Sequence, residues 1–351
     1  MTVADRLITP FAALVFLVPA ACGHGEPYAA TDLHPTGARE PGAVARLTYS
    51  TGRDRSSGWA SGGILYTYED ITTLGRPWCV GLLTDAGGSR TRSWCAQSDS
   101  LVAYDWASEG PGGELAYLRA SSLPFALAPV TWGVMVSASG DPAHGTEISP
   151  VVLTLPGAPP LQGAEQLRWL DANRLVWLGM RRLVGAPCRT CATDTIQSGR
   201  LLLIQDTRQS GLPSALAGTD YATSVAVRGE DELLYTRGGD NRLHRYVVST
   251  GVSTVLWDFA AAGVVRDVQV FGDFVVAVLG GTVTWSFDPE LGDSIQRDFG
   301  GDLVTLDLVS GTMWSAGLPF SIRYPALARD GRRAVVQSVA RPEDIYVVAL
   351  P

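Results

Sequence analysis

Two pairs of cysteines are the residues of this chain whose spacing most directly suggests chemistry. Cys79 and Cys95 bracket the stretch CVGLLTDAGGSRTRSWC, and its centre at residues 85–88 reads as a turn, so the two arms should form a hairpin. With a three-residue loop the two cysteines fall opposite each other, where cross-strand Cβ atoms lie within disulfide reach. The sequence therefore predicts a structural disulfide between them.

The second pair, Cys188 and Cys191, forms PCRTC inside a loop-like stretch. A CxxC spacing can be redox-active or can supply half of a zinc site. No second CxxC or paired histidine follows at zinc spacing, and no βαβ pattern surrounds the motif. A second disulfide is the expectation, with a redox pair and free thiols as the alternatives.

Other reactive groups are few. The chain has no lysine, no G-x-S-x-G motif and four histidines, of which His144 and His244 lie in or beside hairpin turns and are expected to be exposed. The acidic stretches 228–232 and 238–242 offer the clustered oxygens that Ca²⁺ prefers, although surface turns use the same residues for backbone reasons. We predict no catalytic residue, no metal and no cofactor.

Composition limits the choice of partner. The chain has 351 residues, 46% of them apolar, and carries a net charge of −8 with a pI near 5.0. Such a chain can bury a large core, and without a basic run it is a poor candidate for binding nucleic acid.

The first 22 residues have the pattern of a secretory signal peptide. The apolar run ends in PAAC, which resembles the bacterial lipobox, except that Pro19 stands where that pattern prefers leucine. Residues 23–43 read as a flexible tether. We therefore expect an exported lipoprotein of the bacterial cell envelope, held at the membrane only by a lipid on Cys22; ordinary secretion with cleavage nearby is the alternative.

A repeat accounts for the rest of the chain. The stretch ALARDGRRAVVQS has five relatives upstream, and each gives a bulky residue, a turn and an apolar strand. Most units then carry a second hairpin, and helix signals are nearly absent. Four antiparallel strands repeated six times predict an all-β, six-bladed β-propeller over residues 44–351. The bulky positions are Trp59, Trp106, Trp169, Val227, Val270 and Leu327.

The last repeat has only three strands. Residues 44–50 alternate apolar and polar and belong to no unit, so we expect them to pair with 344–350 and complete the sixth blade. Closing the ring in this way would cover an edge that otherwise invites aggregation. Val44, Leu47 and Tyr49 are expected to share one buried face.

The C-terminal repeat also resembles a known family. Arg329-Asp330-Gly331 and the motif Asp-Ile-Tyr at 344–346 are similar to the TolB-type propeller repeat, and the starts at Trp59 and Trp106 match it loosely. The resemblance implies a six-bladed propeller. It does not imply a role in the Tol system, because TolB carries an α/β domain before its propeller and here only the tether is expected there.

In a propeller, the loops that enter the innermost strands surround the mouth of the central channel. The residues at those positions mix both charges with tyrosine, a composition enriched in protein-binding hot spots. We expect a monomeric, non-enzymatic propeller that binds an envelope protein or a glycan there. The alternative is a lyase or lactonase with an acidic metal site, which would need three or more carboxylates converging in the channel. The candidate residues are Asp54, Arg55, Tyr104, Asp105, Glu165, Arg168, Tyr221, Arg266, Asp267, Arg323 and Tyr324.

Overall fold

The structure is a computed structural model. It describes residues 40–49, 52–73, 77–84, 90–96, 102–121, 131–150, 163–182, 198–238, 240–259, 263–280, 283–288, 293–298, 300–339 and 343–351. The predicted signal peptide, most of the tether, Cys22, Cys188 and Cys191 lie outside the described residues.

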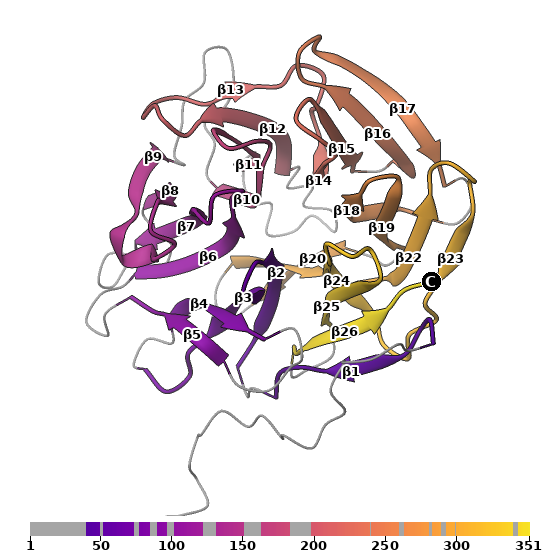
Figure 1. Cartoon of the computed structure of the whole chain (residues 1–351), viewed down its shortest axis with the longest axis horizontal. Helices are drawn as coiled ribbons and strands as arrows, with labels where there is room; N and C mark the ends of the chain where they lie inside the picture. Colours follow the sequence, from indigo (N-terminus) through magenta and orange to yellow (C-terminus); the bar gives the residue numbers. More distant parts are fainter. Residues whose placement is uncertain are drawn as a thin grey trace, which may run out of the picture.

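Six four-stranded antiparallel sheets surround a central axis, so the predicted six-bladed propeller is confirmed (Figure 1). From the innermost strand outward, blade 1 is β2 (Asp54–Ala60), β3 (Gly63–Glu69), β4 (Trp78–Leu83) and β5 (Arg90–Trp94). Blade 2 is β6 (Val102–Glu109), β7 (Leu115–Ser121), β8 (Thr131–Ser137) and β9 (Thr146–Pro150). Blade 3 is β10 (Gly163–Trp169), β11 (Arg174–Arg182), β12 (Ser198–Asp206) and β13 (Ser214–Ala215).

The second half of the ring repeats this order. Blade 4 is β14 (Ala222–Val227), β15 (Glu232–Arg237), β16 (Arg242–Val247) and β17 (Val252–Asp258). Blade 5 is β18 (Val265–Phe271), β19 (Phe274–Leu279), β22 (Asp302–Asp307) and β23 (Met313–Ser315). Blade 6 is β24 (Ile322–Leu327), β25 (Arg333–Ser338), β26 (Ile345–Ala349) and β1 (Val44–Arg46).

The second strand of each blade is the most apolar because neighbouring blades cover both of its faces. In β3, GILYTYE, every residue but the last is buried, and in β19, FVVAVL, every residue but the first. Such strands read as continuous apolar runs rather than as alternating ones. Indole hydrogen bonds add to the contact between blades: Trp59 Nε1 donates to the Ala326 carbonyl and Trp169 Nε1 to the Ser108 carbonyl.

The N-terminal strand closes the ring as predicted. β1 pairs antiparallel with β26, with Val44 opposite Val348 and Arg46 opposite Tyr346. The strand ends at Arg46, however, so the expectation of one face shared by three residues is wrong. Leu47 packs into the core between blades 6 and 1, whereas Val44 points to the other side and contacts the cluster between blades 5 and 6.

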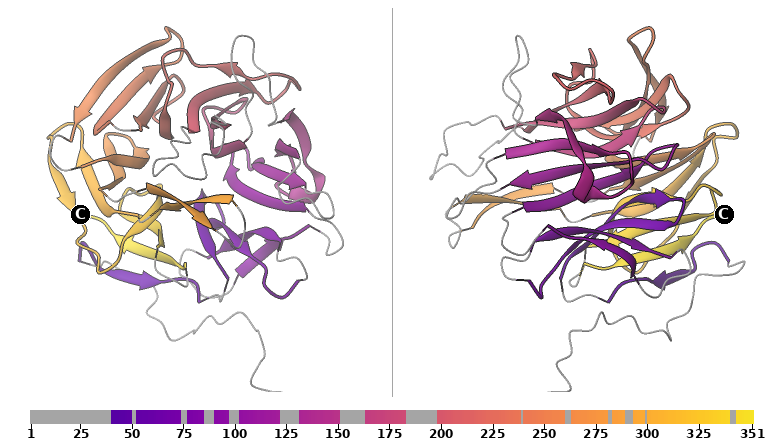
Figure 2. Two further views of the ribbon diagram at one scale, coloured as in Figure 1. Left: turned by 180° about the vertical axis from the view of Figure 1, so that it is seen from behind. Right: turned by 60° about the vertical axis from the view of Figure 1, so that its left-hand side comes forward.

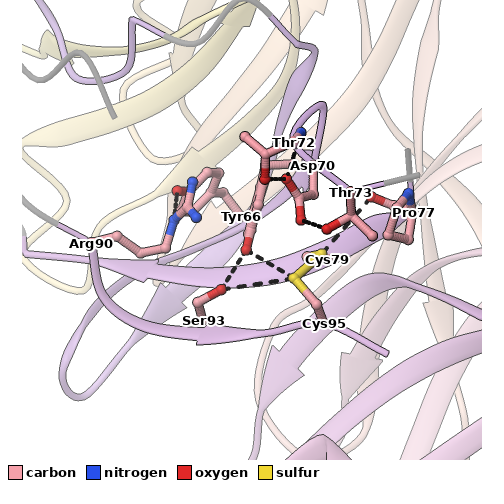
Figure 3. Close-up of a disulfide and its surroundings, with 10 residues drawn as sticks. Tyr66, Asp70, Thr72, Thr73, Pro77, Cys79, Arg90, Ser93 and Cys95 are labelled. Atoms are coloured by element: carbon pink, nitrogen blue, oxygen red, sulfur yellow. Dashed lines mark hydrogen bonds between the residues drawn. A yellow bond between two sulfur atoms is a disulfide. The ribbon is translucent and has the colours of Figure 1, made fainter. Parts of the chain in front are cut away.

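The predicted disulfide between Cys79 and Cys95 is present in blade 1 (Figure 3). The strands keep the expected register, with Val80 opposite Trp94, and a bulge follows between Leu82 and Leu83. Cys79 is fully buried and Cys95 is exposed. The bond therefore ties the outermost strand of the blade to its core.

One element was not predicted. A hairpin of β20 (Val283–Asp288) and β21 (Asp293–Asp298) is inserted between β19 and β22, and it belongs to no blade. Figure 2 shows it projecting beyond the ring in the right-hand view. The one helical element among the described residues is the 3₁₀ turn Pro142–His144, and none of them forms a helix long and apolar enough to cross a membrane.

Candidate functional site

The centre of the ring is shaped by a repeated irregularity of the innermost strands. Each of the six carries a one-residue bulge in its pairing with the second strand. In four blades a residue at the bulge has positive φ: Trp106, Gln166, Asp267 and Tyr324, with φ between 47° and 54°. Such bulges re-aim side chains. Here they turn the side chains of blades 2, 3, 5 and 6 toward the axis.

These four side chains meet across the axis and fill the channel; we call them the channel plug. The Trp106 and Tyr324 rings pack edge to face, with centroids 5.1 Å apart, and join blade 2 to blade 6. Gln166 Nε2 donates to Asp267 Oδ1 at 3.2 Å and joins blade 3 to blade 5. The cavity that remains there is about 10 Å³, room for one water at most. Among the residues that the structure describes, the channel is therefore closed by the protein's own side chains.

Arg55 of blade 1 lies against the channel plug. Its guanidinium donates to Asp105 Oδ2 at 2.6 Å and lies 5.2–5.5 Å from the ring centroids of Trp78, Trp106 and Tyr324. Burial alone would lower the pKa of Arg55, but the charge of Asp105, with smaller contributions from Tyr324 and Glu165, raises it above its ordinary value. Arg55 is thus a permanent cation held in an aromatic and carboxylate cage.

Two further groups define what this centre can do. Burial lowers the pKa of Arg168 to about 10, against the opposing charge of Asp267. Burial also raises the pKa of Tyr324 to about 12, against the charge of Arg55. At neutral pH Arg168 is therefore a cation and the Tyr324 hydroxyl is neutral. These side chains suit binding and positioning better than proton transfer.

Six of the eleven predicted mouth residues converge on this centre. They are Arg55, Asp105, Glu165, Arg168, Asp267 and Tyr324.

Of the other five residues, Arg323 borders this centre, with its guanidinium 5.6 Å from the Tyr324 ring centroid, and the rest have their described contacts elsewhere. Tyr104 packs edge to face on Tyr117 in the core between blades 1 and 2. Arg266 Nη2 donates to the Gly300 carbonyl, and Arg323 pairs with Glu343 at 3.1 Å.

Asp54 is 1% exposed, whereas Tyr221 is 52% exposed. Of these five, Tyr221 is thus the one whose side chain is openly available to a partner.

Sequence reasoning missed Trp78 and Gln166, and it placed Trp106 wrongly. The repeat pattern equates Trp106 with Trp59 and Trp169, which stand just after the bulges of their strands. In the structure Trp106 lies at the bulge of β6 itself. Glu109 occupies the position in blade 2 that corresponds to those two tryptophans. A positive φ at tryptophan, glutamine or tyrosine has no signature in the sequence, because glycine, asparagine and aspartate are the residues that favour this conformation.

Three carboxylates, Asp105, Glu165 and Asp267, lie at this centre, but their oxygens do not gather closely enough to hold one metal ion. Among the described residues, three potential metal-ligand atoms come together only at Asp70, Cys79 and Cys95, and two of these form the disulfide. In the acidic turns, Glu232 accepts from Arg228 and Arg245, and Asp231 accepts from Ser249.

The expectation of an exposed His244 is wrong. The side chain lies within β16, 6% exposed, where its ring packs 5.0 Å from that of Tyr235 and Nε2 is 2.9 Å from Asp240 Oδ2. His144 is exposed, as expected, with 75% of its side chain accessible.

The two faces of the ring differ in their connections. We call the side where the innermost strands begin the mouth face, and the side where they end the turn face. On the turn face the first two strands of a blade are joined by short turns, such as residues 61–62 and 272–273. On the mouth face the second strand of each blade leads into the third, and in blade 5 this connection contains the hairpin of β20 and β21. Long connections of this kind usually carry binding functions.

Comparisons with known proteins agree on the architecture. No protein-family model matches the chain, and no curated protein matches its sequence. Its fold is similar to that of a gluconolactonase from Xanthomonas campestris, with a TM-score of 0.55 and 10% identity over 88% of this chain and 89% of that one. A puromycin hydrolase gives a TM-score of 0.50 and 16% identity over 83% of this chain and 42% of that one. A TolB-like protein from Agrobacterium tumefaciens gives 0.41 and 10% over 70% and 73%. At these identities the likeness concerns the fold alone.

Proposed function

We propose that this protein is a non-enzymatic, envelope-tethered propeller that binds a protein or glycan partner on its mouth face. The observation that carries the proposal is the filled channel. A substrate that had to enter the axis would meet the Trp106–Tyr324 pair and a cavity of about 10 Å³. Recognition at the surface needs no such opening.

The mouth face has features suited to a partner. Tyr221 is 52% exposed and Val264, in the next connection between blades, is 42% exposed. Tyr221 has a positive φ of 63°, and its carbonyl accepts from the Gly238 amide, so its backbone is held in a sparsely populated conformation. A rigid, exposed tyrosine is a typical anchor of a binding surface.

The test compares two equally exposed aromatic residues on opposite faces. Tyr221→Ser removes the aromatic ring from the mouth face, and Phe271→Ser removes one from the turn face, where Phe271 is 50% exposed. Each variant is used to capture partners from envelope extracts, which are quantified against the wild type. Loss with Tyr221→Ser and retention with Phe271→Ser supports the proposal. Equal capture by all three proteins would contradict it.

The alternative, a lactonase or lyase with an acidic metal site, makes a different prediction. It requires carboxylates that converge in the channel as metal ligands; of the three at the centre, Asp105 is engaged with Arg55, and Asp267 with Gln166 and the Tyr324 amide. Lactone hydrolysis with added Ca²⁺ or Zn²⁺ is expected to stay at the rate of the buffer control. A metal-dependent rate abolished by Asp267→Asn would favour the enzyme instead.

The attachment to the membrane is part of the same proposal and is tested separately. PAAC at residues 19–22 motivates lipidation of Cys22. Metabolic labelling with a fatty-acid analogue should mark the wild type and not Cys22→Ala. Equal labelling of the two proteins, or of neither, would refute a lipid anchor at this residue.

A further inference from the structure

A second concave site lies on the turn face, at the seam where the ring closes. The hollow has a volume of about 320 Å³ and lies between the first turn of blade 1, at Ala60–Gly63, and that of blade 6, at Ala328–Arg333. Its size is at the lower end for pockets that take small molecules. It lies at the opposite ends of β2 and β24 from the mouth face and is independent of the function proposed above.

Two guanidinium groups line this hollow. Arg329 is the more open, with 66% of its side chain exposed, and Arg333 is 27% exposed. With Asp330 as the one carboxylate of the lining, the lining has a net charge of +1. Glu109, which pairs with Arg329 from beside the lining, balances this charge. The whole chain carries −8. The hollow is therefore locally neutral on an acidic protein, and its two guanidinium groups face it directly.

Arg333 is held in place before any ligand arrives. Its guanidinium lies 5.1 Å from the Trp59 ring centroid, and its Nη2 is 3.1 Å from Asp330 Oδ2. Asp330 also accepts from the Arg332 amide at 2.9 Å. A cation fixed by stacking and by a carboxylate loses little conformational entropy on binding.

Arg329 is placed to complete the site. Its Nη2 is 3.5 Å from Glu109 Oε2, at the limit of hydrogen-bond distance, while the same carboxylate accepts from the Ser61 hydroxyl at 2.8 Å. A solvent-exposed pair at this distance contributes little to stability. An incoming oxyanion would replace a weak contact with a charge-assisted, bidentate one.

We propose that this hollow binds a small oxyanion, a carboxylate or phosphate group, between Arg329 and Arg333. Guanidinium is the side-chain group whose geometry matches both anions. Because the site joins the turns of blades 1 and 6, an occupied site also holds the ring closed. The bound anion therefore stabilises the folded propeller at its seam.

The experiment titrates the purified chain with inorganic phosphate and with malonate, in Tris chloride, by isothermal calorimetry. Arg329→Gln is expected to weaken the preferred anion about tenfold, and Arg332→Gln, which removes the same charge from the same turn outside the hollow, should leave binding within about twofold. Tighter binding of phosphate identifies a phosphate ligand, and tighter binding of malonate a carboxylate.

Thermal melting provides the second measurement. A saturating anion should raise the melting temperature of the wild type and of Arg332→Gln, but not that of Arg329→Gln. Because Arg329 is largely exposed, its replacement should leave the melting temperature without ligand unchanged. The proposal is overturned if neither anion binds, or if the two variants lose binding equally.

Discussion

Removing the N-terminal strand should destabilise the whole propeller, because β1 is the outermost strand of blade 6 and ties the last blade to the N-terminal end of the described chain. The test compares a chain that begins at Glu40 with one that begins at Gly52. The first keeps β1 and the second lacks it, while both keep every strand from β2 to β26.

The structure gives the size of the effect. Leu47 is 2% exposed, and burying a leucine side chain contributes about 1.5–3 kcal/mol. Three backbone hydrogen bonds flank the ladder, from Gly42 to Ala349, from Leu47 to Ile345 and from Ala349 to Ala43, each contributing about 1 kcal/mol. The loss should therefore be about 4.5–6 kcal/mol before the ion pair is considered, a large share of the ~5–15 kcal/mol typical of a domain.

The ion pair increases this loss. Asp344 is 1% exposed and pairs with Arg46, and the Thr48 hydroxyl accepts from the Ile345 amide at 2.9 Å. Without β1 the Asp344 carboxylate loses its cationic partner.

Urea unfolding followed by tryptophan fluorescence measures the difference. The chain that begins at Gly52 should show a much lower midpoint or should aggregate, whereas the chain that begins at Glu40 should match the full-length protein. Leu47→Ala within the full chain is the finer test, with an expected loss of about 2–5 kcal/mol. Equal midpoints for the two truncated chains would refute the closure.

Three other perturbations test other parts of the structure. Reducing the bond between Cys79 and Cys95, whose separation is 16 residues, should cost about 2–4 kcal/mol in urea unfolding, and a Cys79→Ala/Cys95→Ala double variant should show the same loss without reductant. Trp106→Ala should cost about 3–5 kcal/mol, because the indole is 4% exposed and closes the channel; a midpoint unchanged from the wild type would contradict the filled axis. The hydrogen bond from Arg208 lowers the pKa of Asp206 to about 2, so its stabilisation is present above the ordinary carboxylate pKa and is lost as pH falls toward 2. Melting temperatures measured from pH 5 to pH 2 should decline less for Asp206→Asn than for the wild type.

The blades were predictable because their signals are local. Alternation of apolar and polar residues with turns such as Arg329–Gly331 fixes strands one hairpin at a time, and counting residues across a hairpin placed Cys79 opposite Cys95. The closure by 44–50 followed from the missing strand of the last repeat. The inserted hairpin 283–298 was missed because its strands have the same pattern as blade strands and the repeat spacing is irregular.

The channel centre was less predictable for a physical reason. Its composition was foreseen from the residues that precede each repeat, but the direction of each side chain depends on a bulge. Shifting a side chain by one residue along a strand moves it to the opposite face. Tyr104 therefore faces a neighbouring blade while Asp105 faces Arg55, and no local feature of the sequence distinguishes the two.

The side chains at the axis stabilise the fold, whereas the residues proposed to bind ligands lie on the two faces of the ring. In most repeat architectures each unit contacts only its neighbours. Here Trp106–Tyr324 and Gln166–Asp267 join blades that are not adjacent, so the centre stiffens the ring. Substitutions in the channel plug should then lower the midpoint of unfolding, and those at the proposed binding positions Tyr221 and Arg329 should change binding at an unchanged midpoint. The loops that form a binding surface can vary in sequence, because the side-chain contacts at the axis hold the blades together without them.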